Sequence, residues 1–158
     1  MESFDNMETV ALPNMFWAKF LGFFALWLGA VLNFSTAFMM LSGSIYADQG
    51  LTSKQVYDFY GPALLVSDIY YGAVLLLLVF LQVFTAVAII RKKRIVILLA
   101  PLVYFISVFA AAVYTALSSL VVGESTVSFQ FVFSGIFSII VGFINVIYFK
   151  KREIIFCK

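Results

Sequence analysis

The chain has 158 residues, of which 64% are hydrophobic and 11% are charged, and its formal net charge is +2. Soluble domains of ordinary composition are about 45–50% apolar and about 25% charged. Because so few charged side chains cannot cover the surface of a soluble protein of 17.7 kDa, the composition excludes a water-soluble domain and indicates a protein that lies in a lipid bilayer.

The residues that the composition lacks limit the chemistry of the protein. The sequence contains no histidine, which removes the commonest metal ligand and the side chain that titrates near neutral pH. Its one cysteine, Cys157, cannot form an intramolecular disulfide or a Cys-x-x-Cys redox pair. The sequence also lacks a basic face with interspersed side chains that could contact bases, which nucleic-acid binding requires. We therefore expect a non-enzymatic protein with no catalytic residue, no metal site, no cofactor and no nucleic-acid partner.

Four runs without any charged residue predict four membrane-spanning helices. About 20 helical residues cross a hydrocarbon core of about 30 Å, and each run is long enough for one crossing. Isolated strands cannot span lipid, and the runs lack the alternating pattern of a transmembrane barrel. We expect an all-α, polytopic integral membrane protein, a four-transmembrane-helix bundle that forms a single membrane domain over 1–158. The charge-free runs are 20–47, 69–90, 95–123 and 125–149, and the expected spans are about 17–43, 63–90, 95–122 and 127–149.

The first span has Lys19 at its start and the amide of Asn33 in its interior. Small residues allow helix backbones in lipid to approach closely, and Ala25 and Gly29 lie one helical turn apart. They predict a face that packs against a neighbouring helix. An amide at the depth of Asn33 is expected to find a partner on such a neighbour.

The outer loop, 44–62, is the one connection with room for structure of its own. Thr52-Ser53-Lys54-Gln55 fits a capping box, and Gly61-Pro62 would end the helix that it begins. We expect a short helix over about 53–60. Its aromatic residues Tyr57, Phe59 and Tyr60 would lie at the level of the lipid headgroups; the alternative is a solvated loop helix that binds no ligand.

The second span contains an ionisable residue, Asp68, and a deeper amide, Gln82. Ionisable residues in a span are functional candidates by default. Counting back about 20 residues from Ile90 places Asp68 near the outer boundary. It is either an outward-facing site for a cation or a proton, or a carboxylate at a solvated helix end, where a charge costs little.

The third and fourth spans follow tight turns, so that the second, third and fourth spans should be antiparallel neighbours. Small residues repeat every four residues along both helices and predict close packing. Asn145 extends the stripe of the fourth span. The two stripes are Ala111, Thr115 and Ser119, and Ser134, Ser138 and Gly142.

The basic residues predict the orientation of the bundle. Two clusters, 91–94 and 150–152, fall on one side of the membrane together with Lys19 and Lys158 when the chain crosses four times, which leaves Lys54 on the other side. Basic residues favour the cytoplasm. We therefore expect a multi-pass protein of the plasma membrane with both termini cytoplasmic.

Two stretches, GPALLVSDIYYG at 61–72 and NVIYFKKR at 145–152, open the second span and close the fourth. In these stretches the chain resembles uncharacterised small four-span membrane proteins of low-GC Gram-positive bacteria. The resemblance implies a bacterial plasma membrane and supplies no activity or site residue.

Two hypotheses about function follow. The first is a non-enzymatic accessory or interaction protein, whose partners are the bilayer and other membrane proteins or a second copy of itself. The second is a small transporter or channel subunit, with Asp68 at its outer mouth and Asn33, Gln82 and Asn145 along a polar path.

Overall fold

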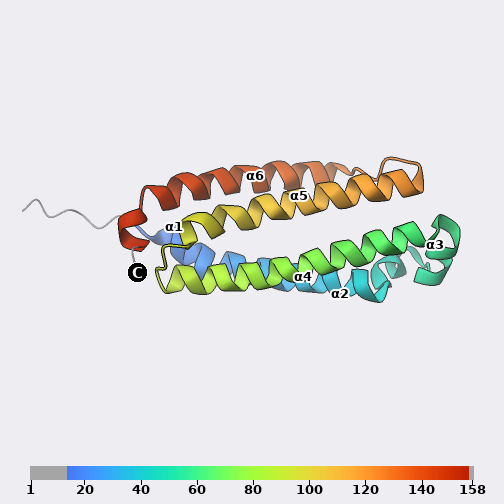
Figure 1. Cartoon of the computed structure of the whole chain (residues 1–158), viewed down its shortest axis with the longest axis horizontal. Coiled ribbons are helices and arrows are strands. Elements are labelled where there is room, and N and C mark those ends of the chain that lie inside the picture. The colour runs from blue at the N-terminus through green and yellow to red at the C-terminus, as the bar shows by residue number, and fades with distance from the viewer. Residues whose placement is uncertain (1–13, 157–158) are drawn as a thin grey trace, which may run out of the picture.

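The computed structural model describes residues 14–156, and Cys157 lies outside the described residues. Within that range all regular elements are helices, and there are no strands (Figure 1). The elements in chain order are α1 (Phe16–Phe20), the π-helical η1 (Leu21–Ala25), α2 (Leu26–Ser42), the 3-10 helix η2 (Ser44–Gln49), α3 (Ser53–Tyr60), α4 (Pro62–Ile90), α5 (Val96–Val122), α6 (Phe129–Lys150) and the 3-10 helix η3 (Glu153–Phe156).

Within residues 14–156, four helical segments are long and apolar enough to cross a membrane, in agreement with the four helices predicted. They are Phe16–Ser42, Pro62–Ile90, Val96–Val122 and Phe129–Lys150. Their bounds lie within a few residues of the predicted ones. The helix predicted at 53–60 is α3, and Thr52 forms both halves of its capping box with Gln55.

The helices form two antiparallel pairs that meet along α4 and α5. α4 packs against α2 on one side and against α5 on the other, and α6 packs against α5 (Figure 1). The prediction that the last three spans are antiparallel neighbours is therefore confirmed. α1 and η3 lie at the end that also holds the Arg91–Arg94 turn, and α3 closes the opposite end.

The first span is interrupted by the π-helical segment η1, which the sequence pattern did not predict. A π-helical turn leaves a carbonyl without its usual partner along the helix. The indole Nε1 of Trp27 donates a hydrogen bond to the carbonyl oxygen of Gly22 at 2.9 Å and satisfies a carbonyl in this segment. In the same segment Gly22 lies against Ile89 of α4, where an added Cβ would be 2.9 Å from Cγ2 of that residue.

A glycine turns the chain between the first span and the loop that follows. Gly43 ends α2 in the left-handed conformation, with φ of 70°, and a Cβ added there would lie 2.5 Å from the Cβ of Ser53. Glycine meets both the conformational and the steric requirement. The turn folds η2 and α3 over the end of the bundle.

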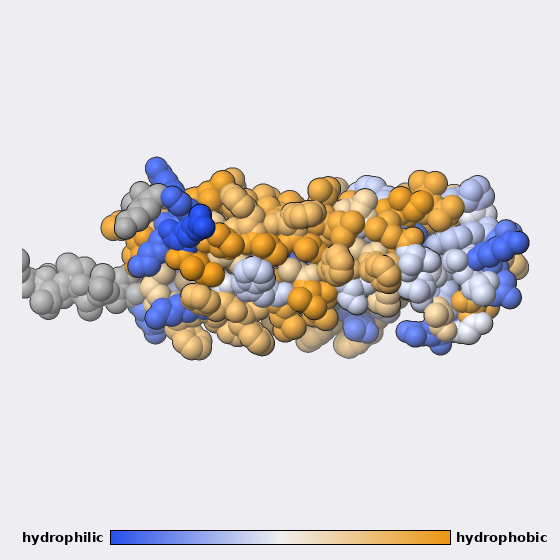
Figure 2. Space-filling model, turned by 90° about the horizontal axis from the view of Figure 1, so that it is seen from below, coloured by the Kyte–Doolittle hydropathy of each residue, from blue (hydrophilic) through white to orange (hydrophobic). Residues whose placement is uncertain are grey.

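Buried apolar residues form two clusters along the bundle axis. The larger one lies at the end with the basic turn and includes Leu21, Leu26, Val103 and Phe149, and the smaller one joins Ala37, Leu75 and Leu78. Most other large apolar side chains are exposed. On the face that Figure 2 shows, apolar residues cover the middle of the molecule and hydrophilic residues gather at both ends. Such a distribution fits a surface solvated by lipid.

The small residues predicted to pack between helices have different surroundings. Gly29 faces Gln82, Gly142 faces the ring of Phe105, and Ala25 packs against the larger core cluster. A small cavity of about 50 Å³ between α5 and α6 is lined by Ala111, Ser134 and Ser138, among others. Thr115 and Ser119 contact the loop before α6 instead, through Thr126.

Two glycines of α6 test whether close packing depends on a missing side chain. A Cβ at Gly142 would lie 2.9 Å from the Phe105 ring, whereas a Cβ at Gly135 would meet nothing within 4 Å. We expect Gly142→Ala to lower the free energy of unfolding by about 1–3 kcal/mol because the ring must move. Gly135→Ala should leave it unchanged or raise it by up to about 1 kcal/mol. Unfolding in detergent micelles, followed by circular dichroism, measures both; equal effects would contradict the prediction.

Candidate ligand site at Asp68

Asp68 lies in the second turn of α4, and its side chain is completely buried, with 0% exposure. The helix begins at Pro62, directly after Gly61. The carboxylate points into the bundle beneath the loop that carries η2 and α3, because Tyr46 and Tyr57 of that loop donate hydrogen bonds to it. The alternative of a carboxylate at a solvated helix end is therefore wrong. The residue is shielded because the loop folds over it.

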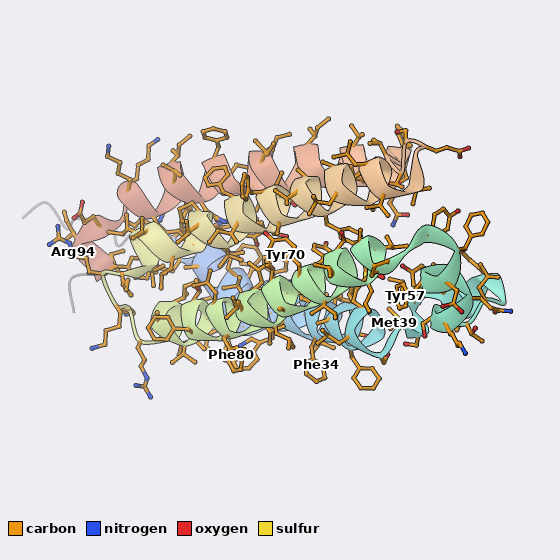
Figure 3. The ribbon with its side chains drawn as sticks, turned by 45° about the vertical axis from the view of Figure 1, so that its right-hand side comes forward. Phe34, Met39, Tyr57, Tyr70, Phe80 and Arg94 are labelled. Atoms are coloured by element: carbon orange, nitrogen blue, oxygen red, sulfur yellow. The ribbon has the colours of Figure 1, made fainter. Side chains whose placement is uncertain are left out.

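Three tyrosines from three different elements donate hydrogen bonds to this carboxylate. The hydroxyl groups of Tyr46 in η2 and Tyr57 in α3 donate to Oδ2 at 2.5 Å and 3.0 Å. The hydroxyl of Tyr114 in α5 donates to Oδ1 at 2.9 Å. The cluster of Asp68 with Tyr46, Tyr57 and Tyr114 is called the tyrosine–aspartate cluster below. It ties the loop to both α4 and α5, and Figure 3 shows Tyr57 at that end of the molecule.

The donors fit the charged form of the carboxyl group. An ionised carboxylate only accepts hydrogen bonds, and each phenol offers one O–H donor. Burying such a charge costs several kcal/mol, and a hydrogen bond to a charged group returns about 1.5–3 kcal/mol. Three of them offset a cost of that size. Within residues 14–156, no lysine or arginine nitrogen lies within 4.0 Å of Asp68.

The phenols of the loop keep their protons at neutral pH. Burial, followed by the hydrogen bond to Asp68 and the charge of that residue, raises the pKa of Tyr57 to about 12. The same causes raise the pKa of Tyr46 above its ordinary value. A raised pKa means that the stabilisation is fully present below pH 10 and is lost as the pH rises through the folded-state value. Both donors therefore persist across the physiological range.

Aromatic contacts hold the rings of the cluster in place. Tyr46 and Tyr57 meet edge to face, with their ring centroids 5.9 Å apart. Tyr71 of α4 stacks on Tyr114, with centroids 4.4 Å apart. Contacts of this kind contribute about 0.5–1.5 kcal/mol beyond the area that they bury. The hydroxyl groups are thus positioned by ring packing as well as by the carboxylate.

A cavity of about 350 Å³ lies beside the cluster, between the loop and α5. Its size is in the range of about 300–1,000 Å³ that is usual for small-molecule sites. Two cluster tyrosines form part of its wall, together with a third aromatic ring and several hydroxyl groups. The lining residues are Tyr46, Gln49, Leu51, Val56, Tyr60, Leu64, Tyr114, Thr115, Ser118, Val122 and Thr126.

Hydroxyl groups fix the far wall of the cavity. Thr126, in the turn after α5, lies 3.0 Å from the hydroxyl of Ser118 and 2.8 Å from that of Ser119. It also donates to the carbonyl oxygen of Thr115 at 3.2 Å. The turn between α5 and α6 is therefore attached to the side of α5 that faces the loop.

The other polar candidates lie apart from the cluster. Asn33 donates through Nδ2 to Oε1 of Gln82 at 3.1 Å, which joins α2 to α4 in the interior of the bundle. Asn145 is fully buried and accepts a hydrogen bond from Trp17 at 2.8 Å, near the end that holds the basic clusters. Its Nδ2 has no hydrogen-bond partner within residues 14–156. These amides connect pairs of helices at different depths, and none of them borders the cavity.

Sequence reasoning selected Asp68 but missed the residues that surround it. Tyr46 is not among the residues that the sequence singles out, and Tyr57 is expected from the sequence at the level of the lipid headgroups. The capping box located α3 correctly, but no local signal indicates that Tyr57 on this helix turns inward to the carboxylate 11 residues later.

Comparison of the chain with protein-family models, with curated proteins and with solved structures found no match. The resemblance to small four-span proteins of Gram-positive bacteria therefore stays a prediction.

Removing one phenol hydroxyl measures the contribution of the cluster to stability. Tyr114→Phe keeps the ring that stacks on Tyr71 but leaves Asp68 without a donor to Oδ1. We expect it to lower the free energy of unfolding by about 1.5–3 kcal/mol. The matched control is Tyr70→Phe, at an exposed tyrosine of α4, which should change it by less than about 0.5 kcal/mol. The free energy of unfolding of both variants is measured in the same micelles. Similar decreases in the two variants would show that the hydrogen bond from Tyr114 to Asp68 contributes nothing to stability.

Proposed function

We propose that this protein is a non-enzymatic integral membrane protein that binds a small organic cation in the cavity beside the tyrosine–aspartate cluster. The observation that carries the proposal is a fully buried carboxylate that has no cationic partner among the described residues and lies next to a cavity lined by tyrosines. A negative charge placed in this way attracts a positive ligand across a short distance of low dielectric constant.

The chemistry of the cavity wall favours an organic ammonium. Tyr46 and Tyr114 use their O–H groups on Asp68, so the remaining lone pairs of their oxygens are available to a ligand. The parts of their rings that do not pack against Tyr57 and Tyr71 border the cavity. Tyr60 adds a third ring. Aromatic faces near a carboxylate attract alkylammonium groups through cation–π interactions. Apolar residues such as Leu51 and Val122 suit the carbon atoms of such a ligand.

A bare metal ion fits this site less well. Metal ions in proteins are held by several carboxylate, imidazole or thiolate groups, and the described residues contain no group of three or more such side chains. Asp68 is the one carboxylate in the cluster, and its two oxygens already accept three hydrogen bonds.

The hydrogen bonds of the amide side chains deeper in the bundle favour a binding site over a conducting path. A polar path requires side chains that line a common passage, whereas Asn33 and Gln82 bond to each other across α2 and α4. Asn145 bonds to Trp17 near the opposite end. In lipid, such amide contacts chiefly hold helices together. We therefore favour a ligand-binding protein, with a site that opens at one end of the bundle, over a transporter.

The proposal includes the orientation of the bundle in the membrane. The Arg91–Arg94 turn and the Lys150–Arg152 segment share one end of the molecule, and the cluster lies at the other. The excess of basic residues supports a cytoplasmic location for the first end and for both termini. In a plasma membrane, the cavity would then face the outside of the cell.

Choline and its neutral isostere 3,3-dimethyl-1-butanol test the proposal, because they share a shape and differ in charge. Isothermal titration calorimetry of the purified protein in micelles should show binding of choline and none of the alcohol. Tyr60→Leu should weaken choline binding roughly two- to thirtyfold, because it removes a cation–π contact. Tyr60→Phe, which keeps the ring, is the matched control and should bind like the wild type.

Asp68→Asn gives the second arm of this experiment and should abolish the preference for the charged ligand. This variant also weakens the cluster. The Tyr60 pair changes none of the three residues that donate to Asp68, so it tests binding without removing a hydrogen bond of the cluster. Equal binding of choline and the alcohol, or no binding of either choline or benzyltrimethylammonium at millimolar concentration, would overturn the proposal.

A second function, that of an accessory or interaction subunit, is favoured by one observation on α6. Its buried residues are Val141, Gly142, Asn145 and Phe149, and all of them lie in its second half. The first half, 129–140, buries none and presents large apolar side chains, among them Phe133 and Ile136. Such a face suits a membrane-embedded partner, either another protein or a second copy of this chain.

Site-specific photocrosslinking in native membranes tests the interaction hypothesis. A benzophenone amino acid at Ile136, which is 55% exposed, should yield a discrete crosslinked protein species. The same group at Phe38 on α2, with 64% exposure, serves as the control and should react with lipid alone. If neither position yields a protein adduct and the chain is monomeric in mild detergent, the interaction hypothesis fails.

A further inference from the structure

The end of the bundle opposite to the tyrosine–aspartate cluster carries a second cavity, of about 370 Å³, at the turn between α4 and α5. Its lining combines three basic side chains, Arg91, Lys93 and Arg94, with apolar residues that include Phe84, Val87 and Ile95. The apolar part lies on the membrane side of the turn and the basic part at its end (Figure 3 shows Arg94 there).

We infer that this cavity is a site for an anionic phospholipid, whose phosphate contacts the basic side chains while an acyl chain lies along Phe84, Val87 and Ile95. Charge complementarity supports the headgroup, because Arg91 and Lys93 have no carboxylate partner within residues 14–156. The exposed ring of Phe84, at 55%, continues the apolar wall into the lipid-facing surface. Basic pockets at the ends of membrane helices bind lipid headgroups of this class.

The backbone of the turn fixes the positions of these cations. Lys92 adopts φ of 52°, a left-handed conformation that favours glycine. Its N–H donates to the carbonyl of Ile89 at 3.0 Å, and the N–H of Lys93 donates to that of Ala88 at 2.9 Å. These two bonds form a Schellman motif at the end of α4. The motif places Arg91 and Lys93 on the side of the cavity, whereas Lys92 does not line it.

The third cation, Arg94, takes part in an exposed ion pair. Arg94 Nη2 lies 2.7 Å from Oε1 of Glu153 in η3, so the side chain is attached to the segment that follows α6. Part of its charge is compensated by this carboxylate. Arg91 and Lys93 therefore carry most of the uncompensated positive charge that a phosphate would meet, and they are the residues to change.

Purified protein in micelles is titrated with phosphatidylglycerol, with phosphatidylcholine of the same acyl chains, and with inorganic phosphate. Native mass spectrometry measures the bound lipid. We expect the wild type to bind phosphatidylglycerol in preference to phosphatidylcholine, and Arg91→Gln with Lys93→Gln to weaken that binding roughly thirtyfold. Phe84→Ser should also weaken it, because the acyl chain loses a wall of the cavity.

Two controls separate a built site from general attraction to the basic end. Lys150→Gln with Lys151→Gln removes the same charge from the neighbouring cluster, and Lys92→Gly removes a cation from the same turn while relieving its backbone. Both should bind phosphatidylglycerol within about twofold of the wild type. Circular dichroism verifies that each variant is folded.

The inference is overturned by three results. They are equal binding of the two lipids, an equal loss in the Lys150/Lys151 variant, and full competition by inorganic phosphate at the concentration of the lipid, which would indicate a site for the free anion. None of these results bears on choline binding at the opposite end, so the two proposals fail or succeed separately.

Discussion

The buried carboxylate of Asp68 sets the constraint on which one end of this molecule depends. A charge that is removed from water must find its hydrogen bonds within the protein. Here Tyr46, Tyr57 and Tyr114 supply them from η2, α3 and α5. Because the donors come from elements far apart in the sequence, satisfying one carboxylate fixes the loop over the bundle and creates the cavity beside it.

The two ends of the bundle differ in charge and in the means by which they are held together. At one end a negative group is enclosed by phenols, and at the other a basic turn is closed by a Schellman motif and the Arg94–Glu153 ion pair. Between them many large apolar side chains are exposed, and they dominate the face that Figure 2 shows. This difference in charge between the two ends matches the two proposed ligands, an organic cation beside Asp68 and an anionic phospholipid beside Arg91 and Lys93.

The interior amides explain how the helices stay in register between these ends. In lipid there is little hydrophobic force between helices, so packing and polar contacts hold them. Gly29 gives Gln82 the space from which it meets Asn33, and Gly142 admits the Phe105 ring. Trp17 bonds to Asn145 and thereby attaches the start of the first span to α6. These contacts use the amides for helix packing, and they leave Asp68 as the one charged side chain that is buried among residues 14–156.

The sequence by itself determined the number of spans, their approximate bounds, the antiparallel order of the last three and the helix over 53–60. These features follow from charge spacing, turn length and a capping box, which are local. It also selected Asp68, since an ionisable group in an apolar run stands out. Only the tertiary structure decided that this residue is buried rather than solvated, that Tyr46 and Tyr57 turn inward, and that Thr115 and Ser119 contact a turn instead of a helix. The reason is that partners separated by 11 to 46 residues leave no periodic trace along the chain. The folding of the loop and the packing of α5 against α4 bring them together in space.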